Sequence, residues 1–383
     1  MEHKKRTFLL GAGFSKSIAA APVMIELWDY IERAHDFEKN RNDLNTTHKE
    51  FRDRIFYSIK NFISGLESDT ISRFANQKFD NIQTDIRQNI EYLLTLIDLH
   101  LKGPCIHFER KDTHITPYPF TPFNLPEKSS LEGLRKDLGT YLYLVFVKLK
   151  ENHFAEEFAN IINQNDEIVT FNYDVVLEKS LLRPGKWYPL GGYVGVNEFE
   201  NPKDKLSLRQ ASKNSNLKIH KMHGSINWKT KGLIQKLYNN DRVMIVMDEL
   251  ESQEFFFVEL SNSLNRSPEK IQGPAVHNPY VGIHEPMWML PSFIKPFERD
   301  EIYKIWQSAL KVIKDSEELV IIGYSFRYED SNSYLLLSVL PAESKITIVD
   351  PNPEQIIDKI KSKGFTNITT YNSLRSYLTK IHN

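Results

Sequence analysis

The stretch Thr7-Phe8-Leu9-Leu10-Gly11-Ala12-Gly13-Phe14-Ser15 decides the fold. Its first four residues predict a short buried strand, and the residues after the second glycine predict the start of a helix. Glycines between a strand and a helix let the backbone turn sharply and approach a phosphate, to which the helix N-terminus offers N–H groups. Lys16 replaces the third glycine of the G-x-G-x-x-G pattern, so this turn alone is a weak indication of nucleotide binding.

Short runs rich in β-branched residues recur along the chain. Ile346–Val349 is nearly continuously apolar or β-branched, as expected for a parallel strand covered on both faces, and helical patterns over Ser331–Leu340 and Pro353–Lys363 follow such runs. This order predicts an α/β fold with a Rossmann-like, doubly wound and mostly parallel sheet. The predicted strands are Thr7–Leu10, Glu167–Phe171, Lys218–Met222, Val243–Met247, Glu318–Ile322, Lys345–Val349 and Asn367–Thr370.

The residues between the first and second predicted strands have helical rather than strand character. Ile90, Leu93, Leu94, Ile97 and Leu101, for example, form one apolar stripe at helical spacing. We therefore expect a Rossmann-like core formed by residues 1–22 and 165–383, and a large helical insertion formed by residues 23–164. Within the insertion, Gly103–Ser130 holds five of the 18 prolines and is predicted to be a long irregular loop.

Composition excludes several classes of protein. Of the 383 residues, 40 % are hydrophobic, and this length and composition are typical of a globular chain of two or three domains. The formal net charge is −1, which favours neither nucleic-acid binding nor membrane-surface binding. One segment differs, because Asn201–Lys236 contains nine basic side chains and the single acid Asp204. It is either a solvated charged face or a surface that attracts an anionic ligand or partner.

The single cysteine, Cys105, excludes an internal disulfide and a zinc site built from cysteines alone. No apolar run is long enough to span a membrane. The first residues imitate a signal peptide, but Lys16 interrupts the apolar stretch and a first strand explains Thr7–Leu10 better. We therefore expect a cytoplasmic protein.

Three further polar segments follow predicted strands: Thr170–Asp174, His223–Ser225 and Gly323–Ser325. Ligands of open α/β sheets bind at the carboxyl ends of the strands, so these segments are expected to converge where a nucleotide would bind. No His, Asp and Glu cluster has metal-ligand spacing, and neither a G-x-S-x-G elbow nor a Walker loop is present.

The ordered set of Gly11–Ser15, Thr170–Asp174, His223–Ser225, Gly323–Ser325 and Asp350–Asn352 resembles the sirtuin-like NAD-consuming family, and more narrowly its bacterial branch in anti-phage defence. The resemblance implies NAD as the substrate. Protein-deacylating sirtuins carry a four-cysteine zinc module that this chain cannot build, so no zinc is expected. The family's cofactor loop continues with Pro-Asp-Phe-Arg, whereas Val23, Met24 and Ile25 follow Pro22 here.

Catalytic roles are expected for Asn172 and His223. The resemblance implies that Asn172 holds water or the ribose and that Asp174 grips the nicotinamide carboxamide; alternatively, Asn172 caps a helix and Asp174 is an acid in its first turn. His223 is the expected general base, because histidine titrates near neutrality, although a lone histidine after a strand is often structural. His220 matches no block and is expected to be structural.

The remaining predicted cofactor-binding residues flank these groups. They are Gly11, Ala12, Gly13, Phe14 and Ser15 in the first turn, Gly323 and Ser325 toward phosphate or ribose, and Asp350 toward ribose. Turn formation before Pro351 is the alternative role of Asp350.

These features predict an NAD glycohydrolase that cleaves NAD to nicotinamide and ADP-ribose. The resemblance implies a purpose, which is the depletion of NAD in a phage-infected cell. We expect this activity to be controlled by homo-oligomerisation or by a partner such as a HerA-type ATPase. The partner is expected to be a separate protein, because the chain ends soon after the last predicted strand. The alternatives are an NAD-dependent protein deacylase, a non-catalytic NAD or ADP-ribose sensor, and a DNA-associated subunit. Cyclic ADP-ribose is an alternative product.

Overall fold

The computed structural model describes residues 5–39, 53, 56–57, 90–102, 128–196, 216–230, 243–245, 286–292 and 299–382. The chain divides into two compact units. The first contains residues 1–21, 146–289 and 296–383, and the second contains residues 22–145 and 290–295.

A six-stranded parallel sheet forms the centre of the first unit, with the strand order β3-β2-β1-β7-β8-β9. The first strand of the sequence lies inside the sheet, and later strands are added on both sides of it. This order confirms the predicted Rossmann-like α/β fold. The strands are β1 (Arg6–Leu10), β2 (Glu167–Thr170), β3 (Lys218–Lys221), β7 (Glu318–Ile322), β8 (Lys345–Val349) and β9 (Ile368–Tyr371).

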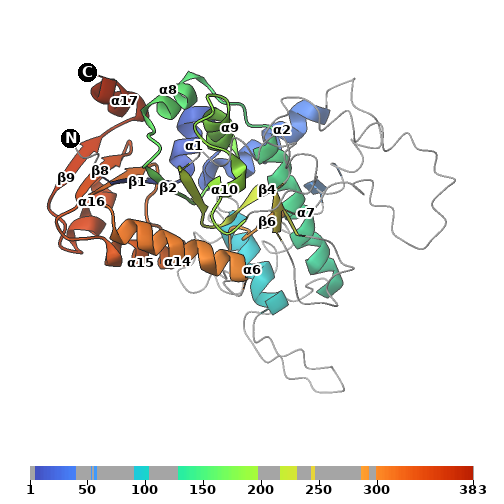
Figure 1. Ribbon diagram of the computed structural model, residues 1–383. Helices are drawn as coiled ribbons and strands as arrows, with labels where there is room; N and C mark the ends of the chain where they lie inside the picture. Colours follow the sequence, from blue (N-terminus) through green and yellow to red (C-terminus); the bar gives the residue numbers. More distant parts are fainter. Residues whose placement is uncertain are drawn as a thin grey trace, which may run out of the picture. The chain divides into compact units, whose positions relative to one another are not determined.

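Helices cover both faces of this sheet (Figure 1). On one face α1, α8, α9 and α17 pack against one another, and on the other α14 packs against α15. The helices and short helical turns of this unit are α1 (Ala12–Ala19), α8 (His153–Ile161), α9 (Val176–Leu182), α10 (Pro189–Gly192), α14 (Asp300–Lys314), η4 (Tyr328–Ser333), α15 (Tyr334–Val339), α16 (Glu354–Lys361) and α17 (Leu374–His382).

Helix α8 falls inside the expected insertion, 23–164, but belongs to the first unit. Its Phe158 lies edge-on to Phe8 of β1, with ring centroids 5.3 Å apart, and to Phe14 of α1, at 4.7 Å. All three rings are buried, so they form part of the core between the sheet and this helical layer.

A second, antiparallel sheet with the order β5-β4-β6 was not predicted. Its strands are β4 (Gly224–Thr230), β5 (Val243–Ile245) and β6 (Pro286–Trp288). The described part of the predicted strand Val243–Met247, residues Val243–Ile245, is therefore in this small sheet rather than in the parallel one. Only the alternation of apolar and polar residues within short runs could have indicated this sheet, and runs of that length do not distinguish a strand from a helix.

The described part of the second unit is helical, with η1 (Met24–Glu26), α2 (Leu27–Lys39), α6 (Ile90–Lys102) and α7 (Lys128–Val147). Ile90, Leu93, Leu94 and Ile97 of the predicted stripe are buried, as the spacing indicated. Residues 103–127 of the predicted loop Gly103–Ser130 lie outside the described residues, and Lys128–Ser130 begin α7. None of the helices in the described ranges is long and apolar enough to cross a membrane.

The switch point of the sheet lies between β1 and β7, and two glycine turns meet there. The Gly11 N–H donates to the carbonyl of Ile322, and the Gly13 N–H donates to that of Gly323, both at 3.0 Å. A Cβ on Gly323 would lie 2.4 Å from the Gly13 backbone, and Gly323 has a φ of +58°. These glycines therefore allow direct backbone packing between the two turns, which no larger residue permits.

Replacing Gly323 by Ala is expected to destabilise the fold more than a positive φ alone explains. Gly364→Ala is the matched control, because Gly364 has a φ of +93° and no atom near its Cβ position. We expect a loss of about 1–2 kcal/mol for the control and about 3 kcal/mol or more for Gly323→Ala, measured by urea unfolding. Equal losses would contradict the packing argument.

Candidate functional site

The predicted site residues follow four neighbouring strands at the carboxyl edge of the parallel sheet. The turn Gly11–Ser15 follows β1, Phe171–Asp174 follows β2, and Gly323–Phe326 follows β7. His223 comes two residues after the end of β3. Because these strands are adjacent and parallel, the four segments lie along one edge that includes the switch point.

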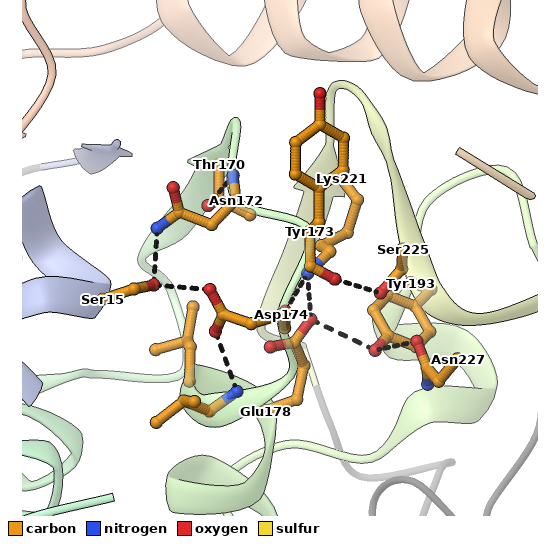
Figure 2. Close-up of polar contacts among 12 residues, drawn as sticks. Ser15, Thr170, Asn172, Tyr173, Asp174, Glu178, Tyr193, Lys221, Ser225 and Asn227 are labelled. Carbon is orange, nitrogen blue, oxygen red and sulfur yellow. Dashed lines mark hydrogen bonds and ion pairs between the residues drawn. The ribbon is translucent and has the colours of Figure 1, made fainter. Parts of the chain in front are cut away.

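Asn172, Ser15 and Asp174 form one buried hydrogen-bonded group (Figure 2). The Asn172 amide Nδ2 donates to Ser15 Oγ at 2.9 Å and to the carbonyl of Gly11 at 2.8 Å. Ser15 in turn donates to Asp174 Oδ2 at 2.7 Å. The segment after β2 is thus bound to the turn after β1 by side chains as well as by the sheet.

These contacts leave one atom of the Asn172 amide available to a ligand. Both hydrogens of the Asn172 amide are used, and no described residue donates to its Oδ1, so the oxygen is the atom that can accept a bond from a ligand. Asn172 does not cap α9, because the N-cap residue of that helix is Val175 and the Asn172 amide bonds to Gly11 and Ser15 instead.

Asp174 precedes α9 rather than standing in its first turn. Its Oδ1 accepts from the N–H of Val176 at 3.1 Å, while Oδ2 accepts from Ser15. The carboxylate therefore orients Ser15 and the start of α9, and its remaining lone pairs are available for a further donor.

A buried ion pair lies beside this group (Figure 2). Lys221 Nζ lies 2.9 Å from Glu178 Oε1, both side chains are only 1 % exposed, and Lys221 also donates to the carbonyl of Asp174. Tyr193 donates to Glu178 at 3.2 Å and lies 3.3 Å from Asn227 Oδ1. The end of β3 is thus joined to the segment after β2.

Burial raises the pKa of Glu178, while the neighbouring Lys221 acts in the opposite direction. The pKa of the Tyr193 hydroxyl is also raised, first by burial and then by the charge of Glu178. Tyr193 therefore remains a neutral donor beside the carboxylate.

His223 lies in the tight connection between β3 and β4. The N–H of Met289, after β6, donates to the His223 carbonyl at 2.7 Å, and Gly224 has a φ of +79° with no room for a Cβ against the Met287 carbonyl. The His223 ring lies edge-on to Phe171 at 5.1 Å, and its Nε2 is 3.2 Å from Asp330 Oδ1. The second sheet therefore holds the histidine backbone.

The turn after β7 is held by backbone contacts with long side chains. Lys359 of α16 donates to the carbonyls of Ser325 and Phe326 at 2.9 and 2.8 Å, and Tyr334 donates to that of Phe326 at 2.9 Å. Phe326 has a φ of +48°, which is uncommon for a residue with a side chain. These donors stabilise the strained conformation.

The other predicted ligand-binding residues differ in whether their side chains can reach a ligand. Ala12 is exposed, whereas the Phe14 side chain is buried against Phe158, so Phe14 can contribute only its backbone to a ligand. Asp350 Oδ1 accepts from the N–H of Asn352 at 2.8 Å, the turn-forming contact that was the alternative to ribose binding. The second carboxylate oxygen of Asp350, Oδ2, takes no part in that hydrogen bond.

Sequence reasoning gave no role in the site to Asp330, Lys221 or Glu178, and it included Tyr324 only as the middle residue of the segment Gly323–Ser325. Lys221 ends the strand Lys218–Lys221, whose sequence is Lys-Ile-His-Lys, so no apolar pattern indicated that its side chain is buried. Nothing in sequence pairs Asp330 with His223, 107 residues away. His220, expected to be structural, is 1 % exposed, with Nε2 3.1 Å from Glu167. Of the basic segment, only residues 216–230 are described.

Replacing Lys221 by Met is expected to cost about 3–5 kcal/mol of unfolding free energy, because it leaves Glu178 buried without a countercharge. Removing Lys221 raises the pKa of Glu178 further, so the folded variant holds a proton there. The loss relative to wild type should therefore be smaller at pH 5 than at pH 8. Urea unfolding at both pH values measures this difference.

Lys345→Met is the matched control. Lys345 lies at the same 2.9 Å from Glu318, but its side chain is 44 % exposed, so we expect a loss of at most about 1 kcal/mol. The double variant Lys221→Met with Glu178→Leu should regain most of the lost stability. A double variant as unstable as Lys221→Met would refute the assignment to an uncompensated charge.

No group of three or more His, Cys, Asp or Glu side chains in the described ranges could hold a metal ion. Cys105 lies outside those ranges.

Solved structures of Sir2 proteins are similar to the chain at low identity. One is a Sir2 homolog–NAD complex, with a TM-score of 0.40 and 11 % identity, covering 100 % of this chain and 92 % of that chain. Another is Sir2 with a p53 peptide and NAD⁺, with a TM-score of 0.38 and 9 % identity, covering 99 % and 92 %. No curated protein matches the chain.

A family comparison covers the part of the chain that contains most of the site. Residues 166–365 match the family described as the SIR2-like domain, and they include Asn172, Asp174, His223, Gly323, Ser325 and Asp350. Because this match spans more than half of the 383 residues, the chain belongs to the SIR2-like domain family.

Proposed function

We propose that the chain hydrolyses NAD to nicotinamide and ADP-ribose. The observation that carries the proposal is the position of Asn172 and His223 on adjacent segments at the carboxyl edge of the sheet, beside the glycine turns of the switch point. Dinucleotides bind at this edge in doubly wound folds. Membership of the SIR2-like family supports the same substrate.

Hydrolysis breaks the bond between the ribose C1′ and the nicotinamide nitrogen. The bonding electrons move to the nitrogen and neutralise the pyridinium, while a water oxygen bonds to C1′ and releases one proton. The products are nicotinamide, ADP-ribose and H⁺. The site must therefore place a water molecule, tolerate positive charge on the ribose and accept a proton.

Asn172 has the geometry to place that water or a ribose hydroxyl. Its Nδ2 is held by Gly11 and Ser15, so the direction of Oδ1 is fixed without a ligand. A fixed acceptor loses little entropy when a donor binds. The same network orients Asp174, whose remaining lone pairs can accept from the carboxamide of nicotinamide.

His223 is the proposed general base. Its imidazole is 6 % exposed, and its backbone is fixed by Met289 and Gly224. A histidine can take the proton of water or of a ribose hydroxyl near neutral pH. Ser325 and the backbone of Gly11–Phe14 and Gly323 supply the proposed contacts to phosphate and ribose. Ser15 donates its hydroxyl hydrogen to Asp174, so Ser15 and Asp350 are proposed only as acceptors for ribose hydroxyls.

We propose hydrolysis rather than protein deacylation because the chain has one cysteine and lacks the Pro-Asp-Phe-Arg continuation after Pro22. Depletion of cellular NAD in anti-phage defence is the proposed purpose. Such an activity must be controlled, and we propose control in the cytoplasm by homo-oligomerisation or by a partner such as a HerA-type ATPase. The basic segment Asn201–Lys236 is a proposed contact surface, without Lys221, whose side chain is buried against Glu178.

Asn172→Ala and His223→Ala should each reduce nicotinamide release by about 100-fold or more, because each removes a group that acts on water or its proton. Chromatography of NAD and its products, with and without a candidate partner, measures the rate. Asn163→Ala and His153→Ala are matched controls at exposed positions and should keep the wild-type rate. Undiminished hydrolysis in both site variants would remove the site assignment.

Nicotinamide release should not depend on an acetyl-lysine peptide. We expect equal rates with and without the peptide, and no deacetylated peptide by mass spectrometry. Peptide-dependent release would replace hydrolysis by deacylation. NAD binding without any turnover would instead favour a sensor.

A further inference from the structure

Asp330 lies outside the predicted site and contacts His223, a proposed catalytic group. It lies in η4, after the turn that follows β7, and its Oδ1 is 3.2 Å from His223 Nε2. The His223 and Asp330 side chains are 6 % and 12 % exposed. A mostly buried carboxylate beside an imidazole interacts more strongly than an exposed pair, because little water screens it.

The Asp330 carboxylate is itself held in position. Its Oδ2 accepts from the Tyr324 hydroxyl at 2.9 Å, and its backbone N–H donates to the carbonyl of Arg327. Tyr324 stacks on Phe171, with ring centroids 4.3 Å apart and an angle of 11° between the planes. Phe171 also meets the His223 ring edge-on, so its ring contacts both residues that bond to the Asp330 carboxylate.

This arrangement selects one form of the histidine ring. A carboxylate accepts but does not donate, so it favours a proton on Nε2 of the neutral imidazole. The neutral ring then takes up its second proton at Nδ1. Once the ring is doubly protonated, the negative charge of Asp330 stabilises the imidazolium.

We propose that Asp330 is a positioning residue for His223, fixing the orientation and the Nε2–H tautomer of the ring, and that Tyr324 fixes Asp330. This inference rests on the proposed function for the role of His223 in NAD hydrolysis. The contacts to His223 and Tyr324 belong to the structure and can be tested without activity.

Asp330→Asn is the decisive variant, because an amide has nearly the same shape but can present a donor to Nε2. We expect kcat for NAD hydrolysis to fall about 10- to 100-fold with KM within about twofold, since a misoriented base impairs proton transfer more than binding. Asp330→Glu keeps a carboxylate and should recover part of the rate.

Nitrogen NMR of the full chain labelled at histidine reads the tautomer directly. The His223 signals are those absent from the spectrum of His223→Gln. They should report Nε2–H in the wild type and a shift toward Nδ1–H in Asp330→Asn. A purely structural role of Asp330 would not move this ratio in a folded variant.

Two controls match these changes. Asp315→Asn removes an exposed carboxylate, paired with Lys5 at 3.3 Å, and should change neither kcat nor the His223 signals. Tyr324→Phe removes one hydroxyl from Asp330 and should give a smaller effect in the same direction, whereas Tyr303→Phe at an exposed position should give none. If Asp330→Asn does not fold, Tyr324→Phe provides both measurements.

The outcomes separate this proposal from the proposed function. A wild-type kcat and an unchanged tautomer in Asp330→Asn, or in Tyr324→Phe if that variant replaces it, would overturn the positioning role. If the wild-type chain releases no nicotinamide under any condition, the proposed function fails. The tautomer shift then still decides whether Asp330 positions His223.

Discussion

The direct backbone packing of two glycine turns at the switch point underlies the rest of the site. Gly323 presses against Gly13 and Phe14, and the Gly13 N–H is bonded to the Gly323 carbonyl. This contact joins the turns that follow the adjacent strands β1 and β7, and the segments after β2 and β3 continue the same edge of the sheet. The glycines are therefore required for the packing of the two turns, in addition to any role in letting the backbone approach a phosphate.

Buried polar groups then join the segments at the ends of β1, β2 and β3, each with a partner that offsets the cost of its burial. Ser15 links the first turn to Asn172 and Asp174, and the ion pair of Lys221 with Glu178 links β3 to the segment after β2. Such a network orients acceptors before a ligand arrives, which is what electrostatic stabilisation of a developing charge requires.

Much of this arrangement could be predicted because it depends on local patterns. Strand runs such as Glu318–Ile322 and Lys345–Val349 coincide with β7 and β8, since continuous apolar runs are typical of strands covered on both faces. The second sheet was missed, because β5 and β6 have only three residues each and short runs carry little periodicity. Phe14 belongs to a conspicuous motif, yet its side chain packs in the core.

The sequence by itself determined the class of fold, the order of the strands along the chain and the polar segments that follow them. These properties depend on periodicity, on glycine and on residues a few positions apart. Only the tertiary structure decided which hydrogens of Asn172 are occupied, that Asp350 closes a turn, and that Asp330 faces His223. The reason is physical: a hydrogen bond depends on distance and direction in space, and strand crossovers bring together residues whose separation in sequence carries no such information.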